Sequence, residues 1–267
     1  MLNRLSQDIR EMLTEQMAFR ELLFQMTRRD LLLRYKQTVM GFGWAVFMPL
    51  LNTIIFSVVF IRVAPLDTGM PYPVYAYCGL VTWNFFASSL RFAVNSLTAN
   101  INLVTKVYFP REIFPFSTVV VCLVDFAVAS TVLVLFMVYY GIGVTAAILF
   151  LPVILIVHIA FTAGVALLLA MGNLFYRDVK YLFEVVLTLW MFATSVLYPV
   201  SLAGGTLGQV LQLNPMTPVI EAYRSVLLRG EMPPAAPFAY AGVMAFVTLA
   251  FAWVVFHRAE FQFAENV

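Results

Sequence analysis

Charged side chains are scarce in this sequence. Only 11% of the 267 residues are Asp, Glu, Lys or Arg, whereas 62% are hydrophobic. A soluble domain has roughly 25% charged residues and must cover its own surface with polar groups. A chain of this length could not bury so much apolar surface in water, so we expect lipid to surround most of it. The net charge of +2 gives no support to a nucleic-acid partner.

Lysine is rare, and no lysine follows a glycine. The three lysines are Lys36, Lys106 and Lys180. A phosphate-binding loop needs a glycine-rich turn that ends in lysine, so we predict no ATP site on this chain. Any ATP-driven activity would place ATP and Mg²⁺ on a partner subunit. We therefore expect no cofactor here, and no enzymatic activity of the chain itself.

Histidine and cysteine are rarer still, with two of each. His158 and His257 lie about a hundred residues apart, which excludes a zinc site built from two histidines on one helix turn. Cys78 and Cys122 lie in apolar stretches without metal-ligand spacing, so we interpret them as packing residues. The sequence predicts no metal site and no catalytic residue.

Long apolar stretches are abundant. A helix needs about 20 largely apolar residues to cross a bilayer. The stretches that meet this requirement are residues 39–61, 74–97, 114–139, 146–172, 183–200 and 237–256. We predict an all-α polytopic membrane protein with six transmembrane helices, in which residues 36–267 form a single transmembrane domain.

Basic residues are distributed unevenly between the two sides that six spans create. Twelve of the sixteen precede the first span, lie in the loops after the second and fourth spans, or follow the sixth. Basic residues concentrate on the cytoplasmic side of membrane proteins. Both termini are therefore predicted to be cytoplasmic.

Residues 1–35 are predicted to form a cytoplasmic amphipathic interface helix. Apolar residues recur there at helical spacing, opposite a charged face: Leu2, Leu5, Ile9, Met12, Leu13 and Met17. This helix either lies along the membrane surface or is a plain cytosolic helix. No secretory signal is predicted, because the stretch lacks an uninterrupted apolar core.

The segment 201–236 follows the fifth span on the external side, yet it is rich in apolar residues. Two short helices separated at Asn214–Pro215 fit it, the second capped by Thr217 and ended by Gly230. Such helices are too short to cross, so they would re-enter the outer leaflet or line a cavity mouth. A well-packed external loop is the alternative.

Two charged residues fall inside predicted spans, where an unpaired charge is unfavourable. Arg91 lies in the second span and Asp125 in the third. At 1.5 Å per residue their heights differ by roughly 6 Å, which an arginine can bridge. We predict an intramembrane ion pair that holds these helices together; a proton- or ion-coupling site is the alternative.

Several motifs together resemble one known family. They are RRDLLLRYKQT at 28–38, KVYFPREIFP at 106–115, YRDVKY at 176–181, NPMT at 214–217 and IEAYR at 220–224. In this order they resemble the type-2 ABC exporter permeases that move O-antigen polysaccharide, capsule or teichoic acid across the bacterial inner membrane. The resemblance covers nearly the whole chain.

The resemblance implies a permease subunit that exports a lipid-linked polysaccharide across the inner membrane. Its expected partners are a second copy of itself in a homodimer, two cytoplasmic ABC ATPase subunits, the lipid-linked polysaccharide and membrane lipids. Two rival functions remain open. One is a permease for a small lipid or drug, and the other is a polyprenyl-sugar glycosyltransferase.

The resemblance also assigns roles to residues. The coupling loop that docks on the ATPase would be residues 100–113, with contacts from Lys106, Val107, Tyr108, Phe109, Pro110, Arg111 and Glu112. A second ATPase contact would come from the N-terminal helix through Arg28, Arg29, Asp30, Arg34 and Tyr35. The segment 201–236 would be an external gate with Asn214, Pro215, Glu221, Tyr223 and Arg224. A membrane-interface loop is the alternative for residues 100–113.

Aromatic residues cluster in the outer half of the second span. They are Tyr72, Tyr75, Tyr77, Trp83, Phe85 and Phe86. Aromatic rings stack on the apolar faces of sugars, so these residues are candidates for lining a glycan channel. An aromatic belt at the lipid headgroups is an equally open interpretation.

Overall fold

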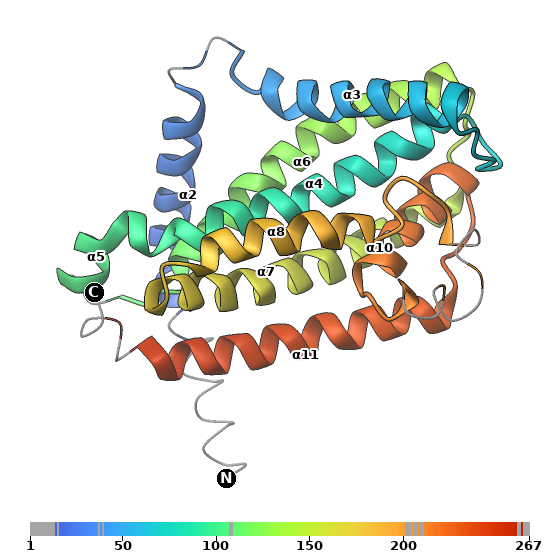
Figure 1. Ribbon diagram of the computed structural model, residues 1–267. Helices are drawn as coiled ribbons and strands as arrows, with labels where there is room; N and C mark the ends of the chain where they lie inside the picture. Colours follow the sequence, from blue (N-terminus) through green and yellow to red (C-terminus); the bar gives the residue numbers. More distant parts are fainter. Residues whose placement is uncertain are drawn as a thin grey trace.

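The computed structural model describes residues 14, 16–36, 38, 40–106, 109–200, 204, 208, 211–260 and 263. Every regular element within these residues is a helix (Figure 1), which confirms the all-α prediction. The longer helices are α2 (Arg20–Tyr35), α3 (Gly43–Val58), α4 (Tyr72–Ser96), α6 (Ile113–Tyr139), α7 (Leu151–Phe175), α8 (Val179–Phe192) and α11 (Ala235–Ala259). The shorter ones are η1 (Val59–Val63), η2 (Thr98–Asn100), α5 (Ile101–Lys106), η3 (Ala146–Phe150), α10 (Met216–Arg224) and η5 (Ser225–Arg229).

Four of these helical segments are long and apolar enough to cross a membrane. They are Gly43–Val63, Ile113–Tyr139, Ala146–Phe175 and Ala235–Ala259, which coincide with the first, third, fourth and sixth predicted spans. The second predicted span corresponds to α4, which has 25 residues but carries more polar side chains. The fifth corresponds to α8, which has only 14 residues. These two are not confirmed as spans by length and composition.

The helix α4, which is less apolar than α3, α6, α7, α8 and α11, lies at the centre of the bundle. It packs against α3, α6, α7, α8 and α10. Its tyrosines reach backbone oxygens of neighbouring segments: the Tyr77 hydroxyl donates to the Ala129 carbonyl at 3.0 Å, and the Tyr72 hydroxyl donates to the Leu197 carbonyl at 3.0 Å. Polar groups of a membrane bundle face its interior because they find partners there. The polar residues of α4 thus explain its central place.

The helices α7 and α11 pack most closely at a glycine. A Cβ atom built on Gly164 would lie 2.8 Å from the backbone nitrogen of Leu249. Small residues allow membrane helices to approach at backbone distance. In Figure 1 these two helices run side by side along the lower part of the bundle.

The helix α3 lies on the opposite edge of the bundle from α11 (Figure 1). Among the long helices that the structure describes, it packs mainly against α4 and α6. Much of its surface is apolar and exposed, through Trp44, Phe47, Met48, Leu51, Ile54, Ile55 and Val58. This face is available to lipid or to another protein surface.

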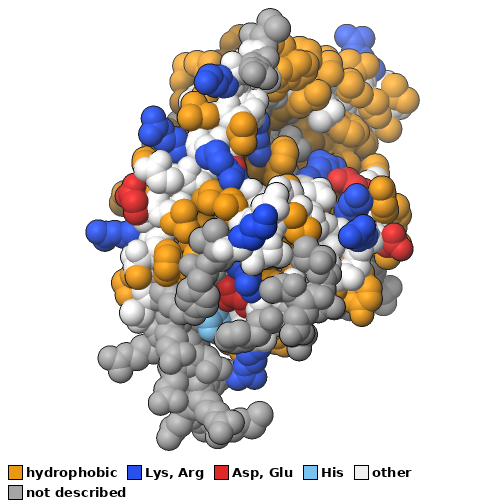
Figure 2. Space-filling view, turned by 90° about the vertical axis from the view of Figure 1, so that its left-hand side faces the viewer, with side chains coloured by type: hydrophobic (Ala, Val, Ile, Leu, Met, Phe, Trp, Pro, Cys, Tyr) orange, Lys and Arg blue, Asp and Glu red, His pale blue; other side chains and the backbone are white. Residues whose placement is uncertain are grey.

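The two ends of the bundle differ in charge and structure. One end carries α2, α5, the connection from α7 to α8, and the last turn of α11; the other carries α10 and η5 (Figure 1). Lys and Arg side chains gather on the first end, as Figure 2 shows. At this end α2 runs at a steep angle to the long helices.

Candidate functional site

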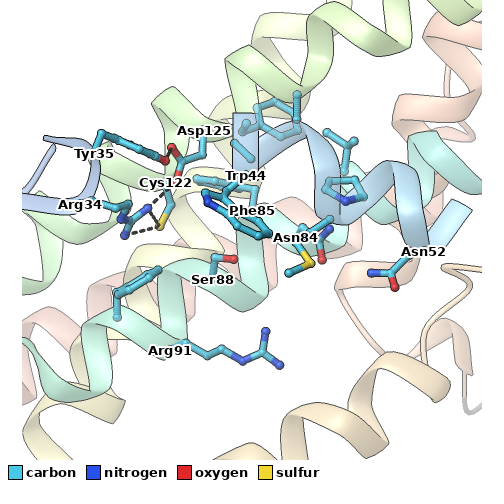
Figure 3. Close-up of a pocket in the computed structure, with 17 residues that line it drawn as sticks. Arg34, Tyr35, Trp44, Asn52, Asn84, Phe85, Ser88, Arg91, Cys122 and Asp125 are labelled. Carbon is cyan, nitrogen blue, oxygen red and sulfur yellow. Dashed lines mark hydrogen bonds and ion pairs between the residues drawn. The ribbon is translucent and has the colours of Figure 1, made fainter. Parts of the chain in front are cut away.

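An open cavity of about 520 Å³ lies between α3, α4 and α6, and the last residues of α2 form one end of it (Figure 3). Its lining follows helical spacing on two elements. Ala45, Met48, Pro49 and Asn52 share one face of α3, and Val81, Asn84, Phe85, Ser88 and Arg91 share one face of α4. Trp44, Phe92, Cys122, Asp125, Phe126, Ala129, Arg34 and Tyr35 complete it.

The cavity combines aromatic surface with neutral hydrogen-bonding groups. Trp44 is 42% exposed, and both Trp44 and Phe85 line the cavity (Figure 3). Asn52 and Asn84 contribute amides, which both donate and accept hydrogen bonds. This lining suits a ligand that has apolar faces and hydroxyl groups on its rim, as a sugar ring does.

The Asp125 carboxylate forms the polar end of the cavity, and its partners correct one prediction. It accepts hydrogen bonds from Arg34 Nη1 and from the Tyr35 hydroxyl, both at the end of α2. Arg91 instead binds Glu184 of α8, with 3.1 Å between Nε and Oε2. Figure 3 shows Arg91 pointing away from Asp125. The predicted Arg91–Asp125 pair is therefore wrong, because α2 brings a competing arginine to α6.

Burial reinforces the contact between Tyr35 and Asp125. It raises the pKa of the Tyr35 hydroxyl to about 12, and the neighbouring carboxylate adds to this effect. The hydroxyl therefore stays protonated at neutral pH and remains a hydrogen-bond donor to Asp125.

Arg34 also separates the cavity from a second one. The guanidinium carbon of Arg34 lies 3.8 Å from the centre of the Phe92 ring. Both residues line the first cavity and also a neighbouring cavity of about 360 Å³, which lies between α2, α4 and α6 next to Asp30 and Asn100. The stacked side chains of Arg34 and Phe92 thus lie between the 360 Å³ cavity, which is near the basic end, and the 520 Å³ cavity, which is deeper in the bundle.

The remaining residues predicted for the N-terminal interface divide into two groups. Arg28 is exposed on α2. Arg29 binds Asp30 at 2.8 Å, and Asp30 accepts a hydrogen bond from the Ser117 hydroxyl of α6 at 3.2 Å. Residues 1–13 lie outside the described part of the chain, so the amphipathic pattern predicted there is untested. The described contacts link α2 to α6, rather than to the first span alone.

The predicted coupling loop is only partly exposed. Lys106 is exposed at the end of α5, whereas Phe109 and Pro110 are buried. Val107 and Tyr108 lie outside the described residues. Arg111 turns inward: its backbone N–H donates to Glu260 Oε1 at 3.0 Å, and its side chain donates to the Glu260 carbonyl.

Glu112 is also buried, with 1% of its surface exposed. Its Oε1 atom lies 3.2 Å from Nδ1 of His257 in the last turn of α11. Arg111 and Glu112, two residues of the predicted coupling loop, therefore contact the end of α11. The end of the last helix competes for these side chains, and no pattern in the sequence predicts that contact.

Sequence reasoning missed the group formed by Glu112, His257 and Glu260. The ligand atoms of these three side chains lie within 4.8 Å of one another. Burial raises the pKa of the Glu260 carboxyl to about 7, and the neighbouring Glu112 carboxylate adds to this effect. His257 and Glu260 are three residues apart at the end of a helix. This spacing, which the sequence shows, places two side chains on the same helix face. Glu112 is 145 residues away from His257 in sequence, so only the fold reveals the cluster.

At the other end of the bundle, Arg224 is fully buried. Its Nη1 atom donates to the Tyr75 hydroxyl at 2.8 Å, to the Ser195 carbonyl at 2.6 Å and to Glu221 at 2.8 Å. A Cβ atom on Gly79 would lie 2.4 Å from Arg224 Nη2, so this site in α4 must be a glycine for the guanidinium to fit. Of the predicted gate residues, Tyr223 is also buried, with 2% of its surface exposed.

Asn214 joins α8 to α10. Its Oδ1 atom accepts from Trp190 Nε1 at 3.0 Å and from the Met216 backbone N–H at 3.1 Å. The residue before α10 is Pro215, so the expectation that Thr217 caps this helix is wrong: Asn214 satisfies the first backbone donor instead. Gly230 ends the helical stretch formed by α10 and η5, with φ +71°, as predicted. The first of the two predicted short helices falls largely outside the described residues.

Residues 21–228 match the ABC-2 type transporter family. The chain belongs to this family. It is 29% identical over 252 residues to the O-antigen export system permease protein RfbA of Myxococcus xanthus, with 93% of this chain and 96% of the relative covered. It is 28% identical over 249 residues to a protein of the same name from Klebsiella pneumoniae, with 92% and 94% covered.

Family membership confirms the resemblance seen in the sequence. An ABC-2 permease is a multi-pass membrane protein and a transport subunit, and an ABC transporter permease implies an ATPase partner. The four apolar helical segments agree with this assignment.

The candidate channel aromatics of this ABC-2 permease lie in its core. All six are buried, and the most exposed, Tyr72, has 4% of its surface accessible. They are Tyr72, Tyr75, Tyr77, Trp83, Phe85 and Phe86. Only Phe85 among them lines the large cavity. Because α4 is central, the aromatic rings of the cluster pack against α6, α7, α8 and α10 in this structure, and the prediction that the cluster lines a channel stays a prediction.

Proposed function

We propose that this ABC-2 permease exports a lipid-linked polysaccharide of the O-antigen type across the bacterial inner membrane, with ATP hydrolysed on a separate subunit. The observation that carries the proposal is similarity over more than nine-tenths of the chain to permeases named for O-antigen export. The 520 Å³ cavity supports it, because aromatic rings and neutral amides suit sugar rings.

The proposed topology has six spans, with both termini in the cytoplasm. α4 and α8 would be the second and fifth spans, with α8 completed by the residues that follow it. The gathering of Lys and Arg on the end that carries α2 and α5 supports a cytoplasmic placement of that end. The steep angle of α2 to the long helices supports an interface helix at the membrane surface, within a unit that spans residues 1–35.

The proposed assembly is a homodimer with two ATPases. One copy leaves its main cavity open beside the exposed apolar face of α3, and a second copy would close this space into a channel. The ATPase surface would be formed at the basic end by exposed Lys106 of the coupling loop, residues 100–113, and exposed Arg28 of α2. The segment 201–236, anchored by Arg224, would be the external gate.

Transport is tested by reconstitution of the permease and its ATPase in lipid vesicles. A fluorescent polyprenyl-diphosphate oligosaccharide is added, and its ATP-dependent movement is measured by access to a lectin. We expect movement with the wild type and a several-fold loss with Trp44→Ala. Phe251→Ala is the matched control, because this ring is 61% exposed on α11 and does not line the cavity.

Two outcomes would contradict the proposal. ATP-dependent movement of a short fluorescent lipid without movement of the glycan would favour the permease for a small lipid or drug. Elongation or transfer of the sugar without movement would favour a glycosyltransferase.

ATPase docking is tested separately by co-purification and by ATP turnover in lipid. Lys106→Glu should weaken co-purification or uncouple turnover from transport, because it reverses an exposed charge at the proposed interface. Arg62→Glu is the control, since Arg62 is exposed in η1 near the opposite end. Equal loss in both variants would contradict the assigned surface.

A further inference from the structure

Three side chains from two distant parts of the chain converge at the basic end of the bundle. Glu112 immediately precedes α6, His257 lies in the last turn of α11, and Glu260 follows that helix. His257 Nδ1 lies 3.2 Å from Glu112 Oε1 and 3.7 Å from Glu260 Oε2. Two ligands of a tetrahedral Zn²⁺ ion stand about 3.3 Å apart, because each lies about 2.0–2.1 Å from the metal. The spacing therefore fits a shared cation.

A second observation points to a ligand at the same place. Glu112 is 1% exposed, and its Oε2 atom has no hydrogen-bond partner among the described residues. A buried carboxylate oxygen without a partner is strongly unfavourable, because the charged group has lost its water. The histidine satisfies only the other oxygen of this carboxylate. A cation bound between the three side chains would satisfy it.

The charges within the cluster also favour a cation. Two carboxylates face each other here, and Arg111 is the neighbouring positive side chain: its Nε atom lies 3.8 Å from Glu260 Oε1. The Arg111 contacts are directed to Glu260 and to backbone oxygens of residues 104 and 260. With His257 neutral, these side chains sum to one negative charge. A divalent ion would offset that charge, and a neutral imidazole is the form of histidine that binds a metal.

The donor set selects the class of metal. Imidazole nitrogen favours Zn²⁺ and related transition metals, whereas Mg²⁺ and Ca²⁺ favour sites made only of oxygen ligands. One histidine and two carboxylates give three protein ligands and leave a fourth position for water.

We propose that Glu112, His257 and Glu260 bind a divalent transition-metal ion of the Zn²⁺ class. The ion joins the residue before α6 to the end of α11 and holds the loop after α5 in place. Because the ligands come together only in the folded chain, the ion stabilises the fold. This site does not depend on which substrate the permease moves.

The test uses the full-length permease in detergent, without a histidine tag, after removal of metals by a chelator. Co²⁺ is added as the probe, since a tetrahedral site with nitrogen and oxygen ligands gives visible absorption bands, and Zn²⁺ is then used to displace it. We expect one Co²⁺ per chain, loss of the bands on addition of Zn²⁺, and a higher thermal midpoint with either metal.

Substitutions of similar size locate the site. Glu260→Gln and His257→Gln should weaken Co²⁺ binding at least tenfold and abolish the rise in thermal midpoint. Glu231→Gln is the matched control, because Glu231 is exposed near η5 at the other end of the bundle. If a substituted chain fails to fold, the proposal is judged on the wild type alone, by its Co²⁺ absorption spectrum and by the number of Co²⁺ ions bound per chain.

Two results would overturn the proposal. One is a wild type that binds no Co²⁺ or Zn²⁺ at one per chain, which would leave a protonated His257 as the partner of both carboxylates. The other is undiminished binding in the folded Glu260→Gln and His257→Gln chains.

Discussion

Arg34 at the end of α2 binds Asp125 in α6 and stacks on Phe92 of α4, with 3.8 Å from its guanidinium carbon to the ring centre. Three elements that belong to different parts of the chain therefore meet at one guanidinium. The contact lies between two cavities, the larger of which holds the aromatic and amide lining.

Loss of the Asp125 charge should destabilise the protein. Asp125→Asn removes the charge that Arg34 faces, and the two side chains are only 19% and 20% exposed. We expect a loss of about 1–3 kcal/mol, below the range for fully buried pairs because water still reaches both groups. Thermal unfolding in detergent measures it. In a double-mutant cycle, Arg34→Met with Asp125→Leu should cost less than the two single changes added together; simple additivity would contradict a direct interaction.

The Arg91–Glu184 pair should contribute little to the stability of the protein, as measured by thermal unfolding in detergent. Its side chains are 47% and 51% exposed, so water screens the attraction. A double-mutant cycle with Arg91→Met and Glu184→Leu should give a coupling energy of about 0–1 kcal/mol in detergent. A value as large as that of Arg34 and Asp125 would mean that this pair is buried in the working assembly.

Gly79→Ala should displace Arg224 from its site. The added methyl group would lie 2.3 Å from the Val196 carbonyl oxygen and 2.4 Å from Arg224 Nη2. We expect a loss of about 1–3 kcal/mol or more, as for other overpacked interiors, with a lower thermal midpoint. Gly242→Ala in α11 is the control, since its Cβ atom would meet Val157 at an ordinary 3.8 Å. Similar effects of the two changes would refute the specific clash.

Loss of both the acceptor and the donor of the Asn214 side chain should destabilise the protein more than loss of the donor alone. Asn214→Ala removes every side-chain bond, whereas Asn214→Asp keeps the oxygen that accepts from Trp190 and from the Met216 N–H. Both variants lose the bond to the Ala193 carbonyl, which is 3.0 Å long. We expect Asn214→Ala to cost about 1–2 kcal/mol and Asn214→Asp less, by thermal unfolding. An Asn214→Asp variant that is destabilised as much as Asn214→Ala would contradict a stabilising role of the two accepted hydrogen bonds.

Several features of this permease were visible in the sequence because they depend on neighbouring residues. Apolar runs predicted the helices α3, α6, α7 and α11, since a span needs only length and composition. Gly230 marked the end of η5, because only a residue without a Cβ atom readily adopts a positive φ. The ordered motifs indicated the family, which the match over residues 21–228 confirms.

Partners across the bundle could not be predicted in the same way. The height estimate for Arg91 and Asp125 used each helix alone, and it could not account for α2 or for the rotation of each helix about its axis. For the aromatic cluster of α4, both a channel lining and a headgroup belt stay open from the sequence, because the sequence does not state which helix is central. Burial of these rings follows from contacts with four other helices.

Sequence by itself determined the helical class, the four apolar stretches that are long enough to cross a membrane, and the family, because hydropathy and motifs are properties of short segments. Tertiary structure alone decided the pairing of Arg34 with Asp125, the inward turn of Arg111, and the meeting of Glu112 with His257 and Glu260. Those contacts join residues 91, 149 and 145 positions apart. Their geometry depends on how the helices cross and rotate, which is a property of the packed bundle.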